Sequence, residues 1–432
     1  MHIDATTLSD LEIFRSPDGS EGLFPLIDRT FTEQGRKALR HRVEHPMSDL
    51  PEVRRTQEAV RFFLRQPRLL RIEDQSLEAV DRYLRSTIEV NAPFPLGERV
   101  EYLWLAVRYR DVLRELRNGV AETVALFQYL AMLARSIEDC APPALISETV
   151  AELQSVAESV LGAQAGPRNL LSVDRTYRGS LLEAIQRALW AVAELDALNA
   201  MALSTAALGW TMPELVESDS FLLDATGVFH PFVEAPVPNP IHLSGGDPMV
   251  FLTGPNMAGK TTYLRSVALV VFLAQLGMGV PATKARLTPV EALFTSLNPA
   301  DNLKAGLSYF LAEVLRVKAA ATLLADGRRS LVLFDEVFKG TNVKDALEAS
   351  AEVILGFAKA RRSGLIFSSH LAELVEVLKT NPNIRFCCFD GEIVSGIPQY
   401  SYQLRDGVSD QRSGVLLLRQ ARIPELIARI SA

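Results

Sequence analysis

The spacing of apolar residues divides this chain into a helical first half and an alternating second half. Between about residues 33 and 210, apolar residues recur three and four positions apart, as in YLWLAVRYRDVLRELRN and LLEAIQRALWAVAELDALNA. This period predicts a series of amphipathic helices. Residues 211–248 are instead rich in proline and glycine and hold only short apolar pieces, which predicts turns joining short strands.

The second half has the pattern of a parallel sheet flanked by helices. The apolar runs MVFLTG, ALFTSL, SLVLFDE and GLIFSS alternate with helical patterns near residues 260–277, 306–325 and 343–360. Strands that alternate with helices in this way are typical of α/β folds. We therefore predict an all-helical domain over residues 1–215, followed by an α/β domain with a mainly parallel sheet over residues 216–432.

The stretch FLTGPNMAGKTTYLRSV contains a glycine-rich turn between a predicted strand and a predicted helix. Its spacing fits a P-loop, whose backbone N–H groups converge on phosphate oxygens at a helix N-terminus. Lys260 would contact the β- and γ-phosphates, and the Thr261 hydroxyl would bind Mg²⁺. A glycine turn without a ligand is the alternative, but the position between strand and helix favours nucleotide binding. The expected nucleotide-binding residues are Gly254, Pro255, Asn256, Met257, Ala258, Gly259, Lys260, Thr261 and Thr262.

Two carboxylates and a histidine follow the other predicted strands. Asp335 and Glu336 end the run LVLFDE, so both would emerge at the carboxyl edge of the sheet, beside the P-loop. Asp335 would help to hold Mg²⁺, and Glu336 would polarise the attacking water. His370 follows GLIFSS and would contact the γ-phosphate or that water at the same edge. The alternatives are a surface turn for the two acids and a structural role for the histidine.

These motifs together resemble a known family. TGPNMAGKTTYLRSV, DNLKAGLSYFLAEV, LVLFDEVFKGTNVKDAL and FSSHLAEL are similar, in order and spacing, to the ATPase domain of the MutS mismatch-repair proteins, which are ABC-type ATPases. The resemblance extends over nearly the whole chain and is weakest between about residues 66 and 175. It implies a helical core and lever domain followed by an ABC-type P-loop ATPase domain.

The resemblance also implies a site shared by two copies of the chain. In such ATPases two heads form a dimer around two nucleotides, and a serine of one head completes the site of the other. Ser308 in AGLSYF corresponds to that serine, although by itself it would be a helix-cap serine. Residues 339–342 would cross towards the partner head, with an ordinary turn as the alternative. The implied reaction is hydrolysis of ATP with Mg²⁺, and the implied catalytic residues are Glu336, His370, Lys260 and Ser308.

The chain departs from the family's pattern in features that concern DNA. MutS proteins that recognise mispairs carry an N-terminal module with a Phe-x-Glu wedge, and no segment here resembles it. The helical half is short for lever helices that bear a distal DNA clamp, so we expect this clamp to be reduced or absent. Ala258 stands where glycine is usual, and Lys339 where arginine is usual. The resemblance still implies DNA as a partner, but the missing wedge argues against mismatch recognition.

The charge and the cysteine content indicate which partners and which cellular compartment to expect. The formal net charge of −7 at pH 7 argues against a broadly basic nucleic-acid surface. Arginines at 99, 108, 110, 114 and 117 could follow DNA phosphates, but alternating acids favour a salt-bridged helix face. Three cysteines without metal-binding spacing fit a reduced, cytoplasmic setting. The most apolar helical run, SVALVVFLAQLGMG, is too short to span a bilayer, so we expect no membrane span and no export.

Two functions remain open at this point. The first is a DNA-transaction ATPase, a homodimer whose ATP-driven closure moves helical levers on DNA in repair or recombination, with a repair protein as a further partner. The second is a nucleotide-gated signalling ATPase that binds another protein and does not bind DNA. A transport ATPase fits poorly, because LSGG at residues 243–246 precedes the P-loop instead of following it.

Overall fold

The computed structural model describes residues 1–15, 22–86, 98–163, 170–297, 309–394 and 397–409, together with residues 423 and 426. The chain divides into two compact units. One unit comprises Ile27–Glu44 and Arg55–Ala206, and the other comprises Met1–Leu26, His45–Arg54 and Ala207–Ala432. The N-terminal segment and residues 45–54 thus pack with the C-terminal half, whereas a single boundary at residue 215 assigns them to the helical domain.

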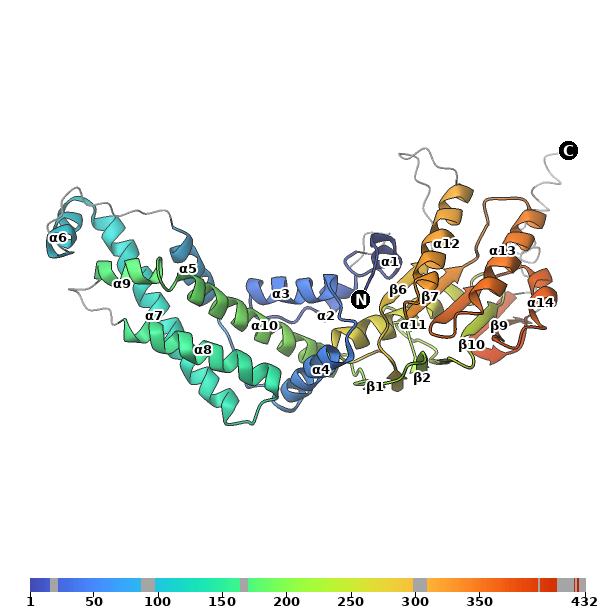
Figure 1. Ribbon diagram of the computed structural model, residues 1–432, viewed down its shortest axis with the longest axis horizontal. Coiled ribbons are helices and arrows are strands. Elements are labelled where there is room, and N and C mark those ends of the chain that lie inside the picture. Colours follow the sequence, from blue (N-terminus) through green and yellow to red (C-terminus); the bar gives the residue numbers. More distant parts are fainter. Residues whose placement is uncertain are drawn as a thin grey trace. The chain divides into compact units, whose positions relative to one another are not determined.

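The first unit is built from helices that pack their apolar faces together (Figure 1). Helix α7 (Arg110–Glu138) contacts α5 (Asp74–Arg85), α8 (Ala144–Gly162) and α9 (Leu170–Tyr177). Its buried residues recur three and four positions apart, which is the spacing of one helix face. The remaining helices here are α3 (Glu33–Glu44), most of α4 (Leu50–Arg65), α6 (Glu98–Arg108) and most of α10 (Leu182–Ala207).

Helix α7 is, within the described ranges, the one helix that is long and apolar enough to cross a membrane by length and composition. Such a helix is weak evidence for a membrane span, because core helices of helical bundles pass the same test. The contacts of α7 with α5, α8 and α9 are those of a core helix. The sequence prediction considered only residues 266–279, which are buried in and just after α11 (Lys260–Leu276).

The described part of the second unit holds two sheets. The larger sheet has the strand order β10-β9-β4-β8-β7-β6, and its neighbouring strands are parallel except for the antiparallel pair β10 and β9. The strands of this sheet are β4 (Met249–Thr253), β6 (Ala292–Ser296), β7 (Ser330–Asp335), β8 (Gly364–Ser368), β9 (Ile384–Val394) and β10 (Ile397–Asp406). The smaller sheet has the order β1-β5-β2-β3, with β1 (Glu214–Leu215), β2 (Leu222–Val228), β3 (Asn239–Ser244) and β5 (Lys284–Leu287).

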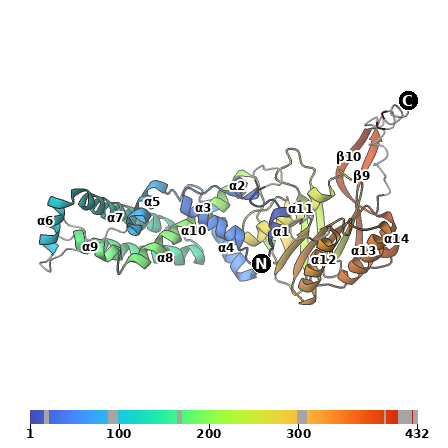
Figure 2. The same cartoon turned by 90° about the horizontal axis from the view of Figure 1, so that it is seen from above.

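Helices cover both faces of the larger sheet (Figure 2). On one face, α12 (Tyr309–Ala325), α13 (Val343–Phe357) and α14 (Ala372–Leu378) share an apolar core with side chains of the strands. Helix α11 contacts β7 of the larger sheet and β2 of the smaller sheet, so it lies between the two. Because it is enclosed in this way, α11 is apolar on nearly all sides.

The fold class predicted from the sequence is confirmed. Strands β4, β6, β7 and β8 coincide with the four predicted apolar runs, and each is buried along its whole length. Such continuous burial is expected for parallel strands covered by helices on both faces. In the register of the sheet, Leu252 and Asp335 both lie opposite Ser368. The carboxyl ends of β4, β7 and β8 are therefore adjacent at one edge.

The N-terminal segment packs on the edge of the larger sheet. Helix α1 (Ala5–Asp10) contacts β6, and α2 (Leu23–Ile27) follows it. The buried Asp10 carboxylate accepts hydrogen bonds from the Thr295 hydroxyl at 2.7 Å and the Leu297 N–H at 2.9 Å. These contacts join the start of the chain to an element almost 300 residues away in sequence, which local periodicity does not encode.

Candidate functional site

Strand β4 leads directly into a glycine-rich loop that turns into α11. Gly254 has a φ angle of 143° and Gly259 one of 96°, values that favour glycine over other residues. A Cβ atom on Gly254 would lie 2.6 Å from the carbonyl oxygen of Phe389, too close for any side chain. Gly259 is the N-cap of α11, and the helix starts at Lys260. Both glycines are therefore required by the backbone of the loop.

The residues between the two glycines divide into buried and open positions. Ala258 is fully buried, and its N–H donates to the carbonyl of Pro255 at 3.3 Å. Met257 has a φ angle of 71° and is 72% exposed. Asn256 and Thr262 line the cavity above the loop. The open side of the loop thus presents the Asn256 amide to this cavity, and the first turn of α11 presents the Thr262 hydroxyl.

Lys260 is the buried cation of the loop. Its side chain is 5% exposed, and its ammonium group donates to the carbonyls of Gly254 at 2.8 Å and Pro255 at 3.1 Å. The nitrogen lies 3.7 Å from Oε1 of Glu336. Burial lowers the pKa of Lys260 from its ordinary value, while the negative charges of Glu336 and Asp335 act in the opposite direction.

Thr261 and Asp335 form a pair of oxygen groups suited to a magnesium ion. The Thr261 hydroxyl donates to the Asp335 carboxylate, which also accepts from the Ser368 hydroxyl. Hydroxyl and carboxylate oxygens are the ligands that Mg²⁺ prefers, usually together with waters and substrate phosphates. Within the described ranges, no group of three or more His, Cys, Asp or Glu side chains could hold a metal ion. A metal at Thr261 and Asp335 would therefore need further ligands from a phosphate group and water.

Glu336 lies among basic side chains at the end of β7. One carboxylate oxygen is 2.8 Å from the Lys339 ammonium and 3.4 Å from Nδ1 of His370, and the other faces Lys260. Burial alone would raise the pKa of Glu336, but the hydrogen bonds and charges of His370 and Lys339 lower it to about 2. Glu336 is therefore ionised at neutral pH.

Four further predicted positions have different outcomes. His370 follows β8 as expected and contacts Glu336, with its side chain 52% exposed. Lys339, expected to face a partner head, contacts Glu336 of its own chain. Asn342 caps α13, because its side chain accepts from the Asp345 N–H. Ser308 lies outside the described residues, so its role stays a prediction.

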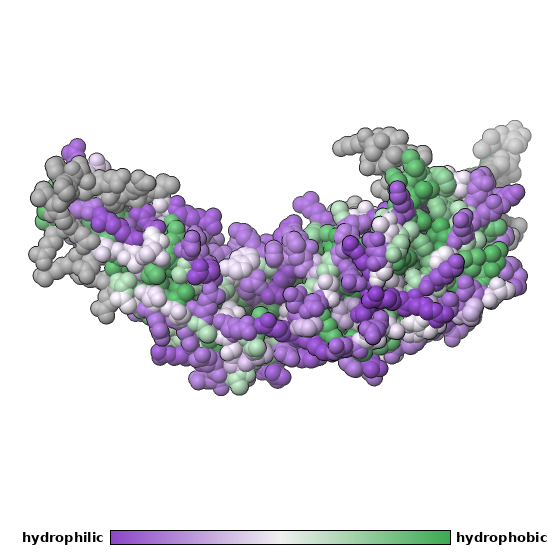
Figure 3. Space-filling view, in the orientation of Figure 1, coloured by the Kyte–Doolittle hydropathy of each residue, from purple (hydrophilic) through white to green (hydrophobic). Residues whose placement is uncertain are grey.

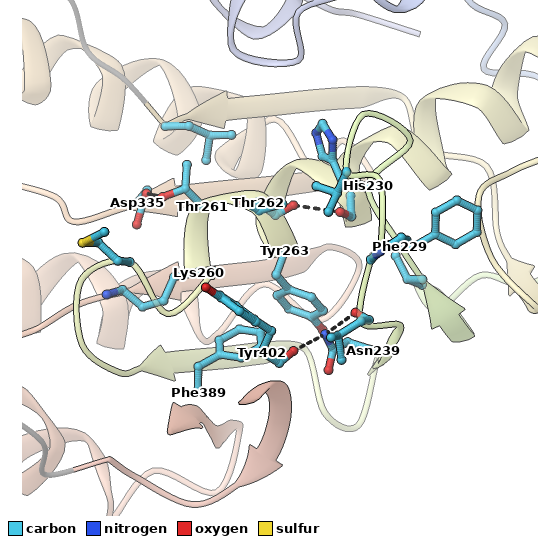
Figure 4. A pocket seen from close by; sticks show the side chains of 18 of the residues that line it. Phe229, His230, Asn239, Lys260, Thr261, Thr262, Tyr263, Asp335, Phe389 and Tyr402 are labelled. Carbon is cyan, nitrogen blue, oxygen red and sulfur yellow. Dashed lines mark hydrogen bonds between the residues drawn. The ribbon is translucent and has the colours of Figure 1, made fainter. Parts of the chain in front are cut away.

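A cavity of about 680 Å³ opens over the loop and has chemically different ends. Lys260 and Asp335 lie at one end, and Phe229 and Asn239 lie towards the other (Figure 4). The volume is that of an ordinary small-molecule site. A cation and paired oxygen groups at one end, with Phe229 and aliphatic groups towards the other, suit a ligand that has an anionic part and an apolar part. The aromatic and aliphatic lining includes Phe229, Val233, Val237 and Tyr402.

Sequence reasoning missed several residues of this cavity. Phe229 and His230 precede β3, and Tyr402 lies on β10, where its carbonyl accepts from the Asn239 amide at 2.9 Å. Ser368, in the predicted strand GLIFSS, was not recognised as a partner of Asp335. The only signal for Phe229 and His230 in the sequence was the presence of aromatic residues near the domain boundary. Their approach to Tyr402 depends on how the two sheets pack.

Comparison with known families places this site in context. Residues 6–202 match MutS domain III, and residues 250–431 match MutS domain V. The chain belongs to the MutS family. The P-loop, Asp335, Glu336 and His370 all lie in the part that matches MutS domain V.

Two proteins named DNA mismatch repair protein MutS are similar to this member of the MutS family. The protein of Bacillus pumilus is 33% identical over 243 residues, which cover 55% of this chain and 28% of the relative. The protein of Dinoroseobacter shibae is 27% identical over 546 residues, covering 99% of this chain and 61% of the relative. The chain thus spans less than two thirds of the length of either relative. The second comparison is longer than this chain of 432 residues, so the relative has internal residues without a counterpart here.

Proposed function

We propose that this chain is an ATP-hydrolysing protein of the MutS type, whose P-loop head binds ATP with Mg²⁺. The observation that carries the proposal is the convergence of Lys260, Thr261, Asp335 and Glu336 on one cavity. A buried cation, a hydroxyl paired with a carboxylate, and an ionised carboxylate are the groups that transfer of a phosphoryl group to water requires.

In this proposal the loop holds the phosphates and the far end of the cavity holds the base. The N–H groups at the start of α11 and the helix dipole attract the phosphate oxygens. Lys260 would exchange its hydrogen bonds to the loop carbonyls for bonds to the β- and γ-phosphates. Mg²⁺ bound at Thr261 and Asp335 would neutralise part of the negative charge of the phosphates. Phe229 offers aromatic surface for the base at that end, whereas the Tyr402 side chain lies beside Gly259 of the loop (Figure 4).

Glu336 is the group proposed to act on the attacking water. Its ionised carboxylate would orient the water and accept a proton as the water oxygen bonds to the γ-phosphorus and the bond to the ADP oxygen breaks. Lys339 and His370 keep this carboxylate charged and limit its orientations. This arrangement supports Glu336 as the base or water-orienting group and His370 as its supporting partner.

We further propose that a second copy of the chain covers an apolar surface beside the site. Apolar side chains gather over α12 (Figure 3), where Val314 and Leu315 are 36% and 44% exposed. Val343 on α13 and Met257 on the P-loop are 68% and 72% exposed. Exposed apolar side chains that gather as they do over α12 favour a protein interface. Ser308 of the second copy would complete the site in this homodimer.

The names of the two relatives support a DNA transaction as the purpose of this ATPase. We propose that ATP binding and hydrolysis in the head drive movement of the helical unit on DNA, in a repair or recombination process. The internal residues that the Dinoroseobacter shibae protein has in addition support a reduced distal clamp in this chain. Protein partners from a repair pathway belong to the same proposal.

A second candidate function, a nucleotide-gated signalling ATPase that does not bind DNA, is favoured by the arginines of α6 and α7. Arg114 pairs with Asp111 at 3.1 Å, and Arg117 donates to the Tyr102 hydroxyl at 2.7 Å. The Asp111 carboxylate partly neutralises the charge of Arg114 and makes it less available for DNA phosphates, whereas the neutral Tyr102 hydroxyl leaves the charge of Arg117 unchanged. A DNA shift assay with and without ATP separates the two candidates, because binding through phosphates weakens steeply as salt rises.

Two variants test the proposed ATPase. Lys260→Ala should weaken ATP binding at least about tenfold, because it removes a charged hydrogen-bond donor to the phosphates. Glu336→Gln should bind ATP normally but should hydrolyse it at least about a hundredfold more slowly, because only the water-orienting charge is lost. Filter binding and a phosphate-release assay measure the two effects. Normal turnover of the Glu336→Gln variant would contradict the role given to Glu336.

A further experiment addresses the DNA part of the proposal. Phosphate release should rise when mispaired, branched or plain duplex DNA is added to the wild-type protein, if DNA engages the helical unit. An ATPase rate that no DNA form changes, combined with no DNA shift, would favour the signalling candidate.

A further inference from the structure

A buried carboxylate outside the proposed catalytic set contacts the loop that follows Glu336. Glu313 lies on α12 and is 3% exposed. One of its oxygens accepts from the Lys339 N–H at 3.1 Å, and the other accepts from the Gly340 N–H at 3.2 Å. A buried carboxylate is unfavourable unless its oxygens are paired. These two bonds therefore fix the backbone of the loop relative to α12.

The loop needs such support because its backbone is strained. Glu336 and Phe338 have φ angles of 53° and 63°, in the left-handed region that residues with a Cβ atom disfavour. Residues in this conformation persist only where their surroundings hold them. The Glu336 N–H donates to the Ser368 carbonyl at 3.0 Å, which holds the start of the strained stretch. Glu313 holds its end.

Helix α12 contacts the loop at a second point as well. The Phe338 side chain is 4% exposed, and its ring centroid lies 5.8 Å from that of Phe310, about one helical turn before Glu313. From the backbone fixed in this way, the Lys339 side chain extends to Glu336, with 2.8 Å between the ammonium nitrogen and the carboxylate oxygen. A continuous series of contacts thus joins α12 to the Glu336 carboxylate.

We propose that Glu313 is a positioning residue for Glu336. By holding the N–H groups of Lys339 and Gly340, the Glu313 carboxylate places the Lys339 ammonium against Glu336. This contact in turn orients the Glu336 carboxylate towards the attacking water. The inference rests on the proposed ATP hydrolysis and adds to it a residue that acts through the loop.

The main test is the Glu313→Gln variant, which keeps the size of the side chain but places an NH₂ group against one of the two N–H donors. We expect kcat for ATP to fall about tenfold or more, while KM and the affinity for a non-hydrolysable ATP analogue change less than about twofold. Glu376→Gln on α14, whose side chain is 72% exposed, is the matched control and should keep wild-type kinetics.

A double variant separates positioning from a general structural role. Residues that act as one unit have non-additive effects, so Glu313→Gln should change the residual rate of Glu336→Gln by less than about twofold. A loss that is equally large in both backgrounds would show that Glu313 acts independently of Glu336 and would overturn the inference.

Lys339→Met provides a second route if Glu313→Gln does not fold. It removes the ammonium group that Glu313 is proposed to position, on a side chain that is 41% exposed. We expect the same loss in kcat with unchanged analogue affinity. Wild-type turnover of Lys339→Met would show that the contact between Lys339 and Glu336 does not orient Glu336, and would overturn the proposal.

Failure of the proposed function would give a different result. In that case the wild-type protein would not hydrolyse ATP, or Glu336→Gln would be as active as the wild type. If the wild type hydrolyses ATP, Glu336→Gln is slow and folded Glu313→Gln is fully active, only the positioning role of Glu313 is overturned.

Discussion

The charged and titratable side chains of the cavity have pKa values set by their surroundings. Burial lowers the pKa of Lys260, and carboxylates nearby oppose this effect. Hydrogen bonds from His370 and Lys339 overcome burial at Glu336 and lower the pKa of its carboxyl to about 2. Burial, together with the charge of Arg265, lowers the pKa of His230 to about 4. At neutral pH the site therefore has an ionised Glu336 and a neutral His230.

The neutral state of His230 predicts a pH dependence of stability. The pKa of about 4 in the folded protein lies below the ordinary value of 6.5, so between these values the unfolded chain binds a proton that the folded chain does not. Stability should therefore fall as pH drops through this window, by up to about 3 kcal/mol for this group. Urea unfolding of the wild type and of His230→Gln at several pH values measures it. The variant should lose less stability over the window, and parallel losses in both proteins would contradict the assignment.

At the scale of elements, α1 packs against β6, the outer strand of the sheet that carries the site. Asp10 at its end is 4% exposed and accepts from groups of Thr295 and Leu297. Glu12, just after α1, pairs at 2.7 Å with Arg265 on α11, the helix that begins at the P-loop. The N-terminal segment therefore contacts both β6 and the helix that follows the glycine-rich loop.

Asp10→Ala should destabilise the α/β unit. Removing the carboxylate leaves the Thr295 hydroxyl and the Leu297 N–H without this buried acceptor, which costs about 1–3 kcal/mol per group. The midpoint of urea unfolding, followed by circular dichroism, should fall accordingly. Asp326→Ala is the control, because the Asp326 side chain is 53% exposed. An equal midpoint for both variants would show that α1 adds little to the stability of the unit.

At the scale of the whole molecule, the chain passes between the two units four times. Helix α11 contacts two of the segments that continue into the helical unit. Arg265 pairs with Glu12, and the Gln275 amide donates to the Met47 carbonyl at 2.5 Å. A change in the position of the P-loop would therefore act, through the buried helix α11, on two chain segments that continue into the helical unit. This continuity supports the proposal that nucleotide binding affects the helical unit.

The proposed homodimer gives a prediction at the same scale. In the Glu336→Gln background, ATP should be retained and should favour a dimer in sedimentation velocity. Adding Leu315→Glu places a charge in the proposed interface and should weaken dimerisation at least about tenfold, because a buried unpaired carboxylate is strongly unfavourable. Val377→Glu on α14, at a residue that is 45% exposed, is the matched control. A dimer that Leu315→Glu leaves intact would exclude this face of α12 as the interface.

The sequence alone determined the elements and the chemistry at the strand ends. The period of apolar residues predicted the helical half, and the runs ending before Gly254, at Asp335 and before His370 predicted the parallel strands. Because neighbouring parallel strands end at the same edge, these residues were expected to meet there. Such information is local, since it depends on residues a few positions apart and on one general rule of sheets.

Only the tertiary structure decided which distant side chains support that chemistry. Glu313 contacts the loop after Glu336, Phe229 and Tyr402 line the cavity, and Asp10 joins the first helix to β6. None of these contacts has a periodic signal, because each depends on the register of strands and the packing of helices from separate parts of the chain. The sequence therefore determined which groups lie at the strand ends, and the packing of the fold determined which further groups join them and how all of them are oriented and held.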